Sequence, residues 1–335
     1  MMPVINRSKA AVITLTLFLT VAAAAKIAPK ENEIVKPKDY RPLEMVSSNR
    51  LKSALDSVVG EVINSYRQQG IKNEELAVTL IDLSDPARPQ IADHRGEAKI
   101  YPASVVKMFY MAALYQQLED RKVAMTKELE RGLRDMIVDS SNEATQYIVD
   151  VLTNTSSGSE LSQKEFDLWA FRRNRMNRYF ASMGFTNINV NQKTHCEDAY
   201  GIEQQFRNYK GENRNMLTTN AAARLIAEIA VGRSVSAERS EMMRQLLKRD
   251  PFATGKDANS QATDFSGMAL LEKKLTGARL WSKAGWTSRT RHDAAYIETP
   301  DGSRFAIAVF TENHANEKNV IPMIVSRIID KLREV

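Results

Sequence analysis

The order of strand and helix signals along this chain of 335 residues limits the folds that it can adopt. Residues 76–82, Leu-Ala-Val-Thr-Leu-Ile-Asp, are typical of a strand, and Asp85-Pro86 opens a turn into the next one. From Ser104 to about Gly277 the signals are nearly all helical. Strands at both ends with helices between them indicate an α/β domain built from both termini and an all-helical insert.

This order predicts where two domains divide. We expect an α/β domain of residues 49–100 and 278–335, and a helical domain of residues 101–277. Apolar side chains recur at helical spacing in residues 50–69 and 319–333, so each end of the α/β domain carries an amphipathic helix. A functional cleft is expected between the two domains, because domain junctions are common ligand sites.

The first residues have the pattern of an export signal. Arg7 and Lys9 precede an apolar run that ends at Ala25 in small residues suited to an A-x-A cleavage site. We expect residues 1–25 to be a signal peptide and the protein to be periplasmic or extracellular; an uncleaved membrane anchor is the alternative. Residues 26–48 contain prolines in a charged setting without periodicity and are a predicted linker.

Composition excludes several classes of function. The 47 basic and 41 acidic residues give a net charge of +6, which is too small and too scattered for a nucleic-acid-binding protein. The single cysteine, Cys196, excludes an intrachain disulfide. The four histidines have no ligand spacing, so we expect neither a metal site nor a cofactor. We expect a monomer that acts on a small molecule.

One S-x-x-K stretch places a hydroxyl and an amine on a buried helix. Residues 101–114 begin Tyr-Pro-Ala-Ser-Val-Val-Lys and continue with apolar residues, so the helix has little polar face. Ser104 and Lys107 are three residues apart on its first turn and therefore share one face. A lysine removed from water loses its proton more readily and can activate a neighbouring serine. One such spacing alone is not surprising in a chain of this size.

Two later tripeptides extend the pattern. Ser140-Ser141-Asn142 has the form S-x-N, and Lys283-Ala284-Gly285 is a variant of K-T-G. In this order the three motifs resemble those of the class A β-lactamases and the related penicillin-binding serine hydrolases. The function that the resemblance implies is therefore acyl transfer to an active-site serine.

The resemblance covers most of residues 50–333. Residues 76–82 and 90–93 are similar to the first hairpin of that family, and residues 290–298 and 305–311 are similar to its last strands. The fold that the resemblance implies is an αβα sandwich with a central antiparallel sheet and an all-helical insert. The order of strand and helix signals supports this fold independently.

The resemblance also implies a role for each motif residue. Ser104 corresponds to the nucleophile, and Lys107 corresponds to its activating base or proton relay. Ser140 would pass a proton to the leaving nitrogen, while Asn142 would hold Lys107 and a substrate amide. Lys283 would supply positive charge for a substrate carboxylate and help to polarise Ser140.

Further substrate-binding groups are expected around the third motif. In the family, the backbone N–H groups of the nucleophile and of the residue after K-T-G form the oxyanion hole, which implies Ser104 and Trp286, with Gly285 beside them. Arg291 is a second candidate for the substrate carboxylate, because a guanidinium can hold a carboxylate through two hydrogen bonds. An ordinary surface arginine on a strand is the alternative for Arg291.

Two of the departures of this sequence from the family concern its chemistry. Ala284 replaces the hydroxyl residue of K-T-G. No E-x-x-L-N loop is present, although a β-lactamase needs a base that activates water for deacylation. Counting back from Thr218 by the interval usual in the family leads to Glu203, with Glu197 as the second choice. A solvated loop glutamate is the alternative for Glu203.

Two functions of different kinds follow. The first is an exported serine hydrolase that acylates Ser104 with a β-lactam and hydrolyses the product; a D-Ala-D-Ala peptidase of the cell wall is a variant of the same chemistry. The second is a catalytically degraded member that binds peptidoglycan or a partner protein. The three intact positions Ser104, Lys107 and Lys283 favour the enzyme.

Overall fold

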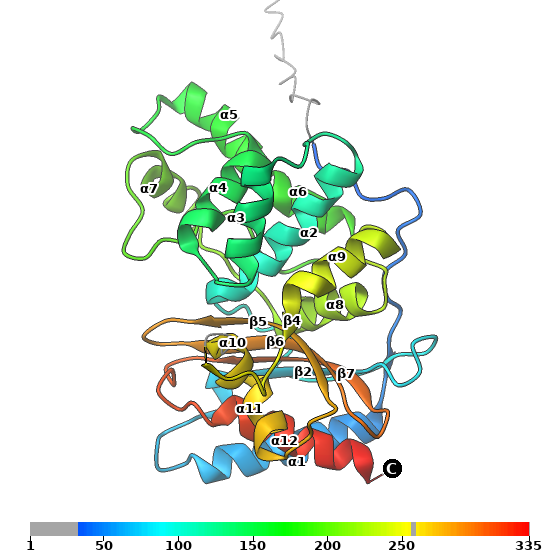
Figure 1. Cartoon of the computed structure of the whole chain (residues 1–335). Coiled ribbons are helices and arrows are strands. Elements are labelled where there is room, and N and C mark those ends of the chain that lie inside the picture. The colour runs from blue at the N-terminus through cyan, green and yellow to red at the C-terminus, as the bar shows by residue number, and fades with distance from the viewer. Residues whose placement is uncertain (1–32, 256–258, 335) are drawn as a thin grey trace, which may run out of the picture. The chain divides into compact units, whose positions relative to one another are not determined.

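The computed structural model describes residues 33–255 and 259–334, and it contains a seven-stranded sheet (Figure 1). The strand order is β1-β3-β2-β7-β6-β5-β4. Neighbouring strands are antiparallel, except that β1 and β3 are parallel. The strands are β1 (Val46–Ser47), β2 (Leu76–Asp82), β3 (Gln90–His94), β4 (Lys248–Arg249), β5 (Arg279–Trp286), β6 (Arg291–Glu298) and β7 (Arg304–Thr311).

Segments from the two ends of the sequence meet in the middle of the sheet. Strand β2 pairs with β7 along its whole length, from Leu76 opposite Thr311 to Asp82 opposite Phe305. Both strands are almost entirely buried, and both are rich in the apolar and β-branched residues that suit a strand covered on two faces. The predicted α/β fold, with strands from both ends of the chain in one sheet, is confirmed.

Helices near both ends of the chain, together with one from residues 266–272, cover one face of this sheet (Figure 1). They are α1 (Asn49–Ser65), α11 (Ser266–Glu272) and α12 (Val320–Arg333). The apolar stripes of α1 and α12 pack on each other and on the sheet in a cluster that we call the lower core. Burying each of these side chains contributes about 1.5–3 kcal/mol. The two amphipathic helices expected from their periodicity are therefore present.

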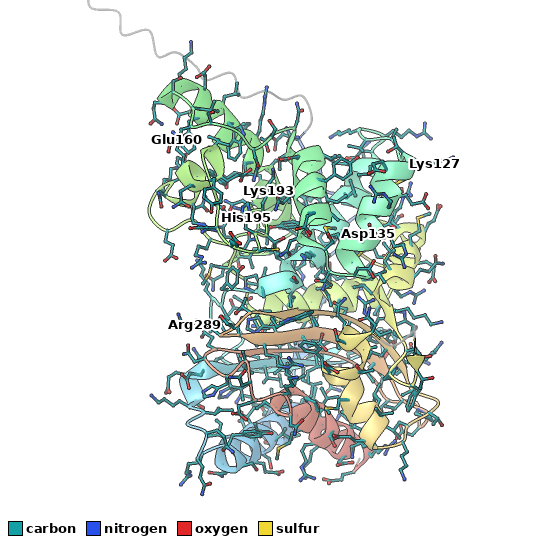
Figure 2. All side chains as sticks on the ribbon, turned by 60° about the vertical axis from the view of Figure 1, so that its left-hand side comes forward. Lys127, Asp135, Glu160, Lys193, His195 and Arg289 are labelled. Atoms are coloured by element: carbon teal, nitrogen blue, oxygen red, sulfur yellow. The ribbon has the colours of Figure 1, made fainter. Side chains whose placement is uncertain are left out.

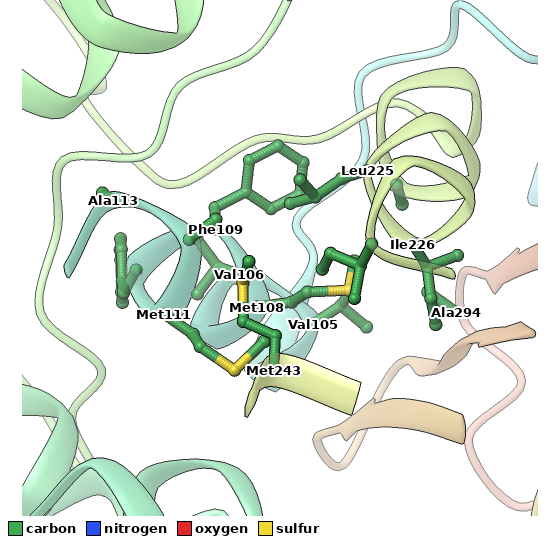
Figure 3. Close-up of a cluster of buried hydrophobic side chains, with 14 of the residues drawn as sticks. Val105, Val106, Met108, Phe109, Met111, Ala113, Leu225, Ile226, Met243 and Ala294 are labelled. Atoms are coloured by element: carbon green, nitrogen blue, oxygen red, sulfur yellow. The ribbon is translucent and has the colours of Figure 1, made fainter. Parts of the chain in front are cut away.

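The opposite face of the sheet carries the helical part of the chain. Helix α8 (Thr219–Ala230) lies on β2, β6 and β7, and α2 (Val106–Glu119) is buried from Val106 to Leu118. Figure 3 shows Met108 and Phe109 of α2 near Leu225 of α8 and Met243 of α9 (Ala237–Leu247). These side chains belong to a second cluster, the upper core. A helix buried on all sides holds its first turn in a fixed place.

The other helical elements surround α2 or lie at the edges of the sheet. Helices α3 and α4 are separated at residues 138–141, which include Ser140 of the S-x-N motif. The elements are η1 (Asn73–Glu75), η2 (Ala103–Val105), α3 (Lys127–Ile137), α4 (Asn142–Thr153), α5 (Gln163–Arg173), α6 (Arg175–Ser182), α7 (Ile202–Arg207) and α10 (Ser260–Thr263).

The asparagine-rich stretch 186–216 contains only one short helix, α7, and is organised by side-chain hydrogen bonds. The Oδ1 atom of Asn215 accepts from the backbone N–H groups of Asn191 and Gln192. The side chain of Asn189 donates to Asn213. Asparagine side chains here take the place of backbone pairing, which explains the weak periodicity of this stretch.

Residues 33–48 are not the free linker that their composition predicted. Leu43 is buried in the upper core, and the Tyr40 hydroxyl donates to the carboxylate of Glu228 on α8. These apolar and hydrogen-bonding contacts fix the segment, which the prolines alone did not reveal. The proposed signal peptide, residues 1–25, lies outside the described residues. In the described part of the chain, none of the helices is both long enough and apolar enough to span a membrane.

Candidate active site

Ser104 lies in the short η2 turn that leads into α2. The preceding residue, Ala103, has a φ of 46°, a left-handed conformation that is unusual for alanine. Strand β5 approaches this turn at Gly285. A Cβ atom on Gly285 would lie 2.7 Å from the Ser104 backbone nitrogen and 2.8 Å from the Pro102 carbonyl oxygen, so only glycine permits this approach. The third motif therefore lies directly against the turn of residues 101–104, which we call the nucleophile turn after the role expected of Ser104.

Lys107, one turn along α2, is fully buried beside the loop that follows α3. Its ammonium donates to the Ser140 carbonyl oxygen at 2.5 Å and to Asn142 Oδ1 at 2.8 Å. Burial lowers the pKa of Lys107 to about 7, against a smaller opposing effect of the Glu143 carboxylate. A lysine with this pKa is partly unprotonated near neutral pH and can accept a proton.

The two serines of the S-x-N loop, Ser140 and Ser141, make different contacts. Ser141 is the N-cap of α4, because its Oγ accepts from the backbone N–H of Ala144 at 3.1 Å. Ser140, with a φ of 58°, instead places its Oγ 3.4 Å from Lys107 Nζ and 3.0 Å from Lys283 Nζ. The capping role and the position beside the lysines therefore belong to different residues.

Lys283 reaches the same hydroxyl from strand β5. Its ammonium also donates to Gln261 Oε1 at 2.5 Å and to the Ala284 carbonyl oxygen at 2.8 Å. Burial lowers the pKa of Lys283 well below its usual value, and the charges of Lys107 and Arg249 lower it further. The structure thus brings Lys107, Ser140, Asn142 and Lys283 into one hydrogen-bonded cluster beside the Ser104 turn.

Two residues of this cluster's surroundings were missed from the sequence. Gln261 of α10 joins Lys283 to the end of α3, because its Nε2 donates to the Val138 carbonyl oxygen at 2.8 Å. The thiol of Cys196 accepts from Asn142 Nδ2 at 3.4 Å and lies 3.8 Å from Glu143 Oε1. Neither residue belongs to a motif, so no sequence signal could have placed them here.

The structure does not bring Arg291 to the lysine cluster. Arg291 of β6 pairs opposite Trp286 of β5, and these side chains lie on the sheet face opposite to Lys283, because neighbouring residues of a strand alternate. The Arg291 guanidinium donates to the Asp264 carbonyl oxygen at 2.6 Å and stacks on Phe265 in the lower core. The expectation that Arg291 binds a substrate carboxylate is corrected accordingly.

Trp286 also directs its side chain to the face opposite to Lys283. Its indole is 46% exposed and packs at a centroid distance of 5.7 Å against Phe265. The predicted contribution of Trp286 to the oxyanion hole concerns its backbone N–H and not this side chain. That contribution stays a prediction, as does the part assigned to the Ser104 N–H.

Glu203 is buried in an ion-pair cluster. Both of its carboxylate oxygens accept from the Arg173 guanidinium at 2.8 Å, and Oε1 also accepts from Ser157 at 2.9 Å and lies 3.3 Å from Lys193 Nζ. Burial opposes the charged form, yet the charge of Arg173 and these hydrogen bonds hold the pKa of Glu203 below its usual value.

These contacts correct the expected role of Glu203. A carboxylate whose lone pairs are taken by an arginine, a lysine and a serine cannot also take a proton from water. Figure 2 shows Lys193 and His195 of the segment between α6 and α7, on the helical side of the sheet. Glu197, the second choice, is an exposed residue next to Cys196.

Within residues 33–255 and 259–334, no group of three or more His, Cys, Asp or Glu side chains could hold a metal ion.

Comparisons with solved structures support the same fold. The chain superposes on a β-lactamase from Sphaerobacter thermophilus with a TM-score of 0.61 and 19% identity, covering 83% of this chain and 98% of that one. PBP-A gives a TM-score of 0.59 and 14% identity over 88% of this chain and 100% of that one. A β-lactamase from Chitinophaga pinensis gives a TM-score of 0.58 and 16% identity, covering 84% of this chain and 99% of that one.

Comparisons of sequence give the family. No curated protein sequence matches the chain significantly. The model of the beta-lactamase enzyme family matches residues 54–332, a range that contains all three motifs and the whole sheet from β2 to β7. The chain therefore belongs to the beta-lactamase enzyme family.

Proposed function

We propose that the protein is an exported hydrolase that acylates Ser104 with a β-lactam and then hydrolyses the acyl-enzyme. One observation carries the proposal: the Ser140 hydroxyl lies within hydrogen-bond distance of both Lys107 and Lys283, and the pKa of Lys107 is lowered to about 7. Such a group can take a proton from one hydroxyl and pass it through another.

In the proposed acylation, Ser104 Oγ forms an ester bond with the β-lactam carbonyl carbon as the amide C–N bond breaks. The Ser104 proton passes to the unprotonated amine of Lys107. Ser140 donates its own proton to the leaving nitrogen and regains one from Lys107. The ammonium of Lys283 stabilises the substrate carboxylate. Gly285 keeps β5 close to the Ser104 backbone N–H, which faces the oxyanion.

A cell-wall D-Ala-D-Ala peptidase is the second candidate, and the surroundings of Lys107 favour it over a degraded binding protein. The hydrogen-bond partners of Lys107 among the described residues are oxygens of Ser140, Ser141 and Asn142. None of them is a carboxylate, which would keep the ammonium charged, so Lys107 can still act as a base. With Glu203 held by Arg173, an acyl-enzyme would be released slowly. A mutant of the structural relative PBP-A is described as an acyl-enzyme complex with penicillin G.

Labelling with a fluorescent penicillin tests the proposal. We expect the purified protein to be labelled covalently and Ser104→Ala to lose all label while remaining folded, because alanine at a helix start costs about 1 kcal/mol. Ser141→Ala is the matched control, since it removes a cap but keeps Ser140, and it should still be labelled. Labelled Ser104→Ala would exclude this nucleophile.

Turnover then separates the two enzymatic candidates. Steady hydrolysis of nitrocefin with many turnovers per site supports the β-lactamase. A single burst of product equal to the enzyme concentration, followed by slow release, supports the peptidase. An absence of both label and turnover would leave the binding protein as the function.

The exported location rests on residues 1–25 and is part of the same proposal. We expect expression of the full chain in a Gram-negative host to yield a periplasmic protein shortened after Ala25. The mass of the purified protein and its distribution between cell fractions check this. An intact N-terminus in the membrane fraction would indicate the uncleaved anchor.

A further inference from the structure

His292 lies in the sheet directly behind the nucleophile turn, and no motif includes it. It is fully buried on β6 and pairs opposite Gly285 of β5. Residues directly opposite each other in an antiparallel pair share a face, so the imidazole lies on the face where Gly285 meets the Ser104 turn. Histidine is seldom fully buried. A buried imidazole needs hydrogen-bond partners for its ring nitrogens.

Both ring nitrogens of His292 have a partner, and the partners fix the tautomer. The backbone N–H of Thr311 donates to Nδ1 at 3.1 Å, so Nδ1 carries no proton. The proton therefore lies on Nε2, which donates to the Tyr101 carbonyl oxygen at 2.9 Å. Burial lowers the pKa of His292 to about 4, so the ring stays neutral near neutral pH. A neutral ring with its proton on Nε2 is therefore consistent with both hydrogen bonds.

The acceptor of this hydrogen bond belongs to the nucleophile turn. Tyr101 precedes Pro102 and Ala103, and the next residue is Ser104. The Pro102 carbonyl oxygen and the Ser104 nitrogen are the atoms that Gly285 approaches. The turn is thus held by neighbouring positions of β5 and β6, through a close backbone contact at Gly285 and a hydrogen bond from His292.

The backbone of this turn is strained and depends on the contacts around it. Ala103 adopts a left-handed φ of 46°, and such a conformation of a non-glycine residue costs on the order of 1–3 kcal/mol. It persists only where the surrounding contacts determine it. Without the hydrogen bond to Tyr101, the turn could relax and shift both the Ser104 hydroxyl and the Ser104 N–H. A shift of about 1 Å at a reacting group can cost about a hundredfold in rate.

We propose that His292 is a positioning residue for acylation: its Nε2–H holds the Tyr101 carbonyl and thereby sets the Ser104 hydroxyl and N–H against β5. The inference rests on the proposed function, in which Ser104 is the nucleophile. It predicts that His292 affects the reaction of a bound substrate and not its binding, because the imidazole is fully buried and its hydrogen-bond partners are backbone groups of Tyr101 and Thr311.

Two substitutions separate the two hydrogen bonds of His292. Glutamine can place an N–H near the position of Nε2 and keep the contact with Tyr101, but it loses the acceptor for Thr311. Asparagine keeps an acceptor near Nδ1 and is too short to reach Tyr101. We expect His292→Asn to lower the rate constant of acylation by penicillin about tenfold or more, with the Kd of the non-covalent complex unchanged within about twofold. We expect His292→Gln to stay within about threefold of wild type.

Phe310→Leu is the control for packing alone. It removes the ring that lies 4.6 Å from the His292 centroid and leaves both hydrogen bonds in place. We expect it to lower Tm without changing the acylation rate constant of the folded protein. Equal acylation rates in wild type, His292→Asn and His292→Gln would overturn the inference. If His292→Asn does not fold, a tenfold loss in folded His292→Gln would also overturn it.

A second probe distinguishes a failure of this inference from a failure of the proposed function. Phenylboronic acid forms a tetrahedral adduct with an active-site serine and does not require β-lactam chemistry. Its inhibition constant should rise in His292→Asn and not in His292→Gln. If the wild type binds the boronate but is not labelled by penicillin, the proposed substrate is wrong and the boronate still decides the role of His292. If the wild type reacts with neither, both proposals fall.

Discussion

At Ser140, two buried lysines converge on one hydroxyl. The Oγ atom lies 3.4 Å from Lys107 Nζ and 3.0 Å from Lys283 Nζ. Burial disfavours the charged form of both lysines, and the charge of Lys107 adds to this effect at Lys283. The pKa of each lysine is lowered, to about 7 for Lys107 and well below its usual value for Lys283. The site can therefore exchange protons with a substrate near neutral pH.

The rate of acylation should depend on pH through Lys107. Because the pKa of Lys107 is about 7, the amine is protonated below that pH and available as a base above it. We expect the acylation rate constant with a neutral β-lactam ester to rise between about pH 6 and pH 8 and then to level off. Stopped-flow labelling measures it. A constant rate over this range would assign the proton transfer to another group.

Lys283 should govern the recognition of a free carboxylate. We expect Lys283→Ala to slow acylation by benzylpenicillin far more than acylation by its methyl ester. A bound carboxylate also raises the lowered pKa of Lys283, so binding of the acid takes up a proton and weakens as pH rises, whereas binding of the ester does not. Paired rate measurements with the acid and the ester check both points. Equal losses with both substrates would reject this role.

At the scale of secondary structure elements, the Glu203 cluster joins α7 to α5. Arg173 ends α5, and Lys193 comes from the intervening segment. We expect Glu203→Gln to lower the free energy of unfolding by about 3–5 kcal/mol, because it removes one of the two carboxylates, Glu203 and Asp150, that pair with the buried Arg173 and Lys193. Urea denaturation followed by circular dichroism measures the change.

The pH dependence of this contribution has a definite direction. The pKa of Glu203 is lower in the folded protein than in the unfolded chain, where it is about 4.3. The stabilisation is therefore complete above that value and is lost as the pH falls through the folded pKa. Glu203→Gln should flatten this loss of stability at acid pH, which we call the acid limb. Exposed Glu160→Gln is the matched control and should change neither the stability nor the limb. A fully stable Glu203→Gln variant would contradict the assignment.

The sequence predicts the parts of the site that depend on local geometry. Ser104 and Lys107 share a helix turn because residues three apart on a helix share a face, and the break before Asn142 follows from good capping residues. The short runs rich in apolar and β-branched residues likewise reveal the strands at both ends. These features require only neighbours along the chain, and the structure has them as expected.

The features that the sequence did not reveal depend on contacts between distant segments. Arg291 lies on the opposite face from Lys283 because the length of the turn between β5 and β6 sets which residues pair, and a shift of one residue reverses the face. Glu203 looks like a loop glutamate until Arg173 is placed beside it. Gln261 reaches Lys283 from a four-residue helix. None of these partners is identifiable from spacing.

At the scale of the whole molecule, the sheet separates two hydrophobic cores. The upper core contains α2, which carries Lys107, whereas the lower core lies under α1 and α12 on the other face. We expect Ile328→Ala in α12 to cost about 2–5 kcal/mol of stability, because it opens a cavity in the lower core. Calorimetry should show a lower Tm, and the acylation rate constant of the folded protein should not change. A parallel loss of both would mean that the sheet transmits strain between the cores.

The late position of β5 and β6 in the sequence also determines when reactivity can arise during biosynthesis. The nucleophile turn is made early, but it stays without its β5 and β6 supports until residues 279–298 have been added. Pairings between distant segments form late and slowly, since a large loop must close first. A chain still attached to the ribosome would carry Ser104 and Lys107 and yet fail to react with penicillin. Covalent labelling therefore times the completion of synthesis and folding, and not merely the presence of the motif.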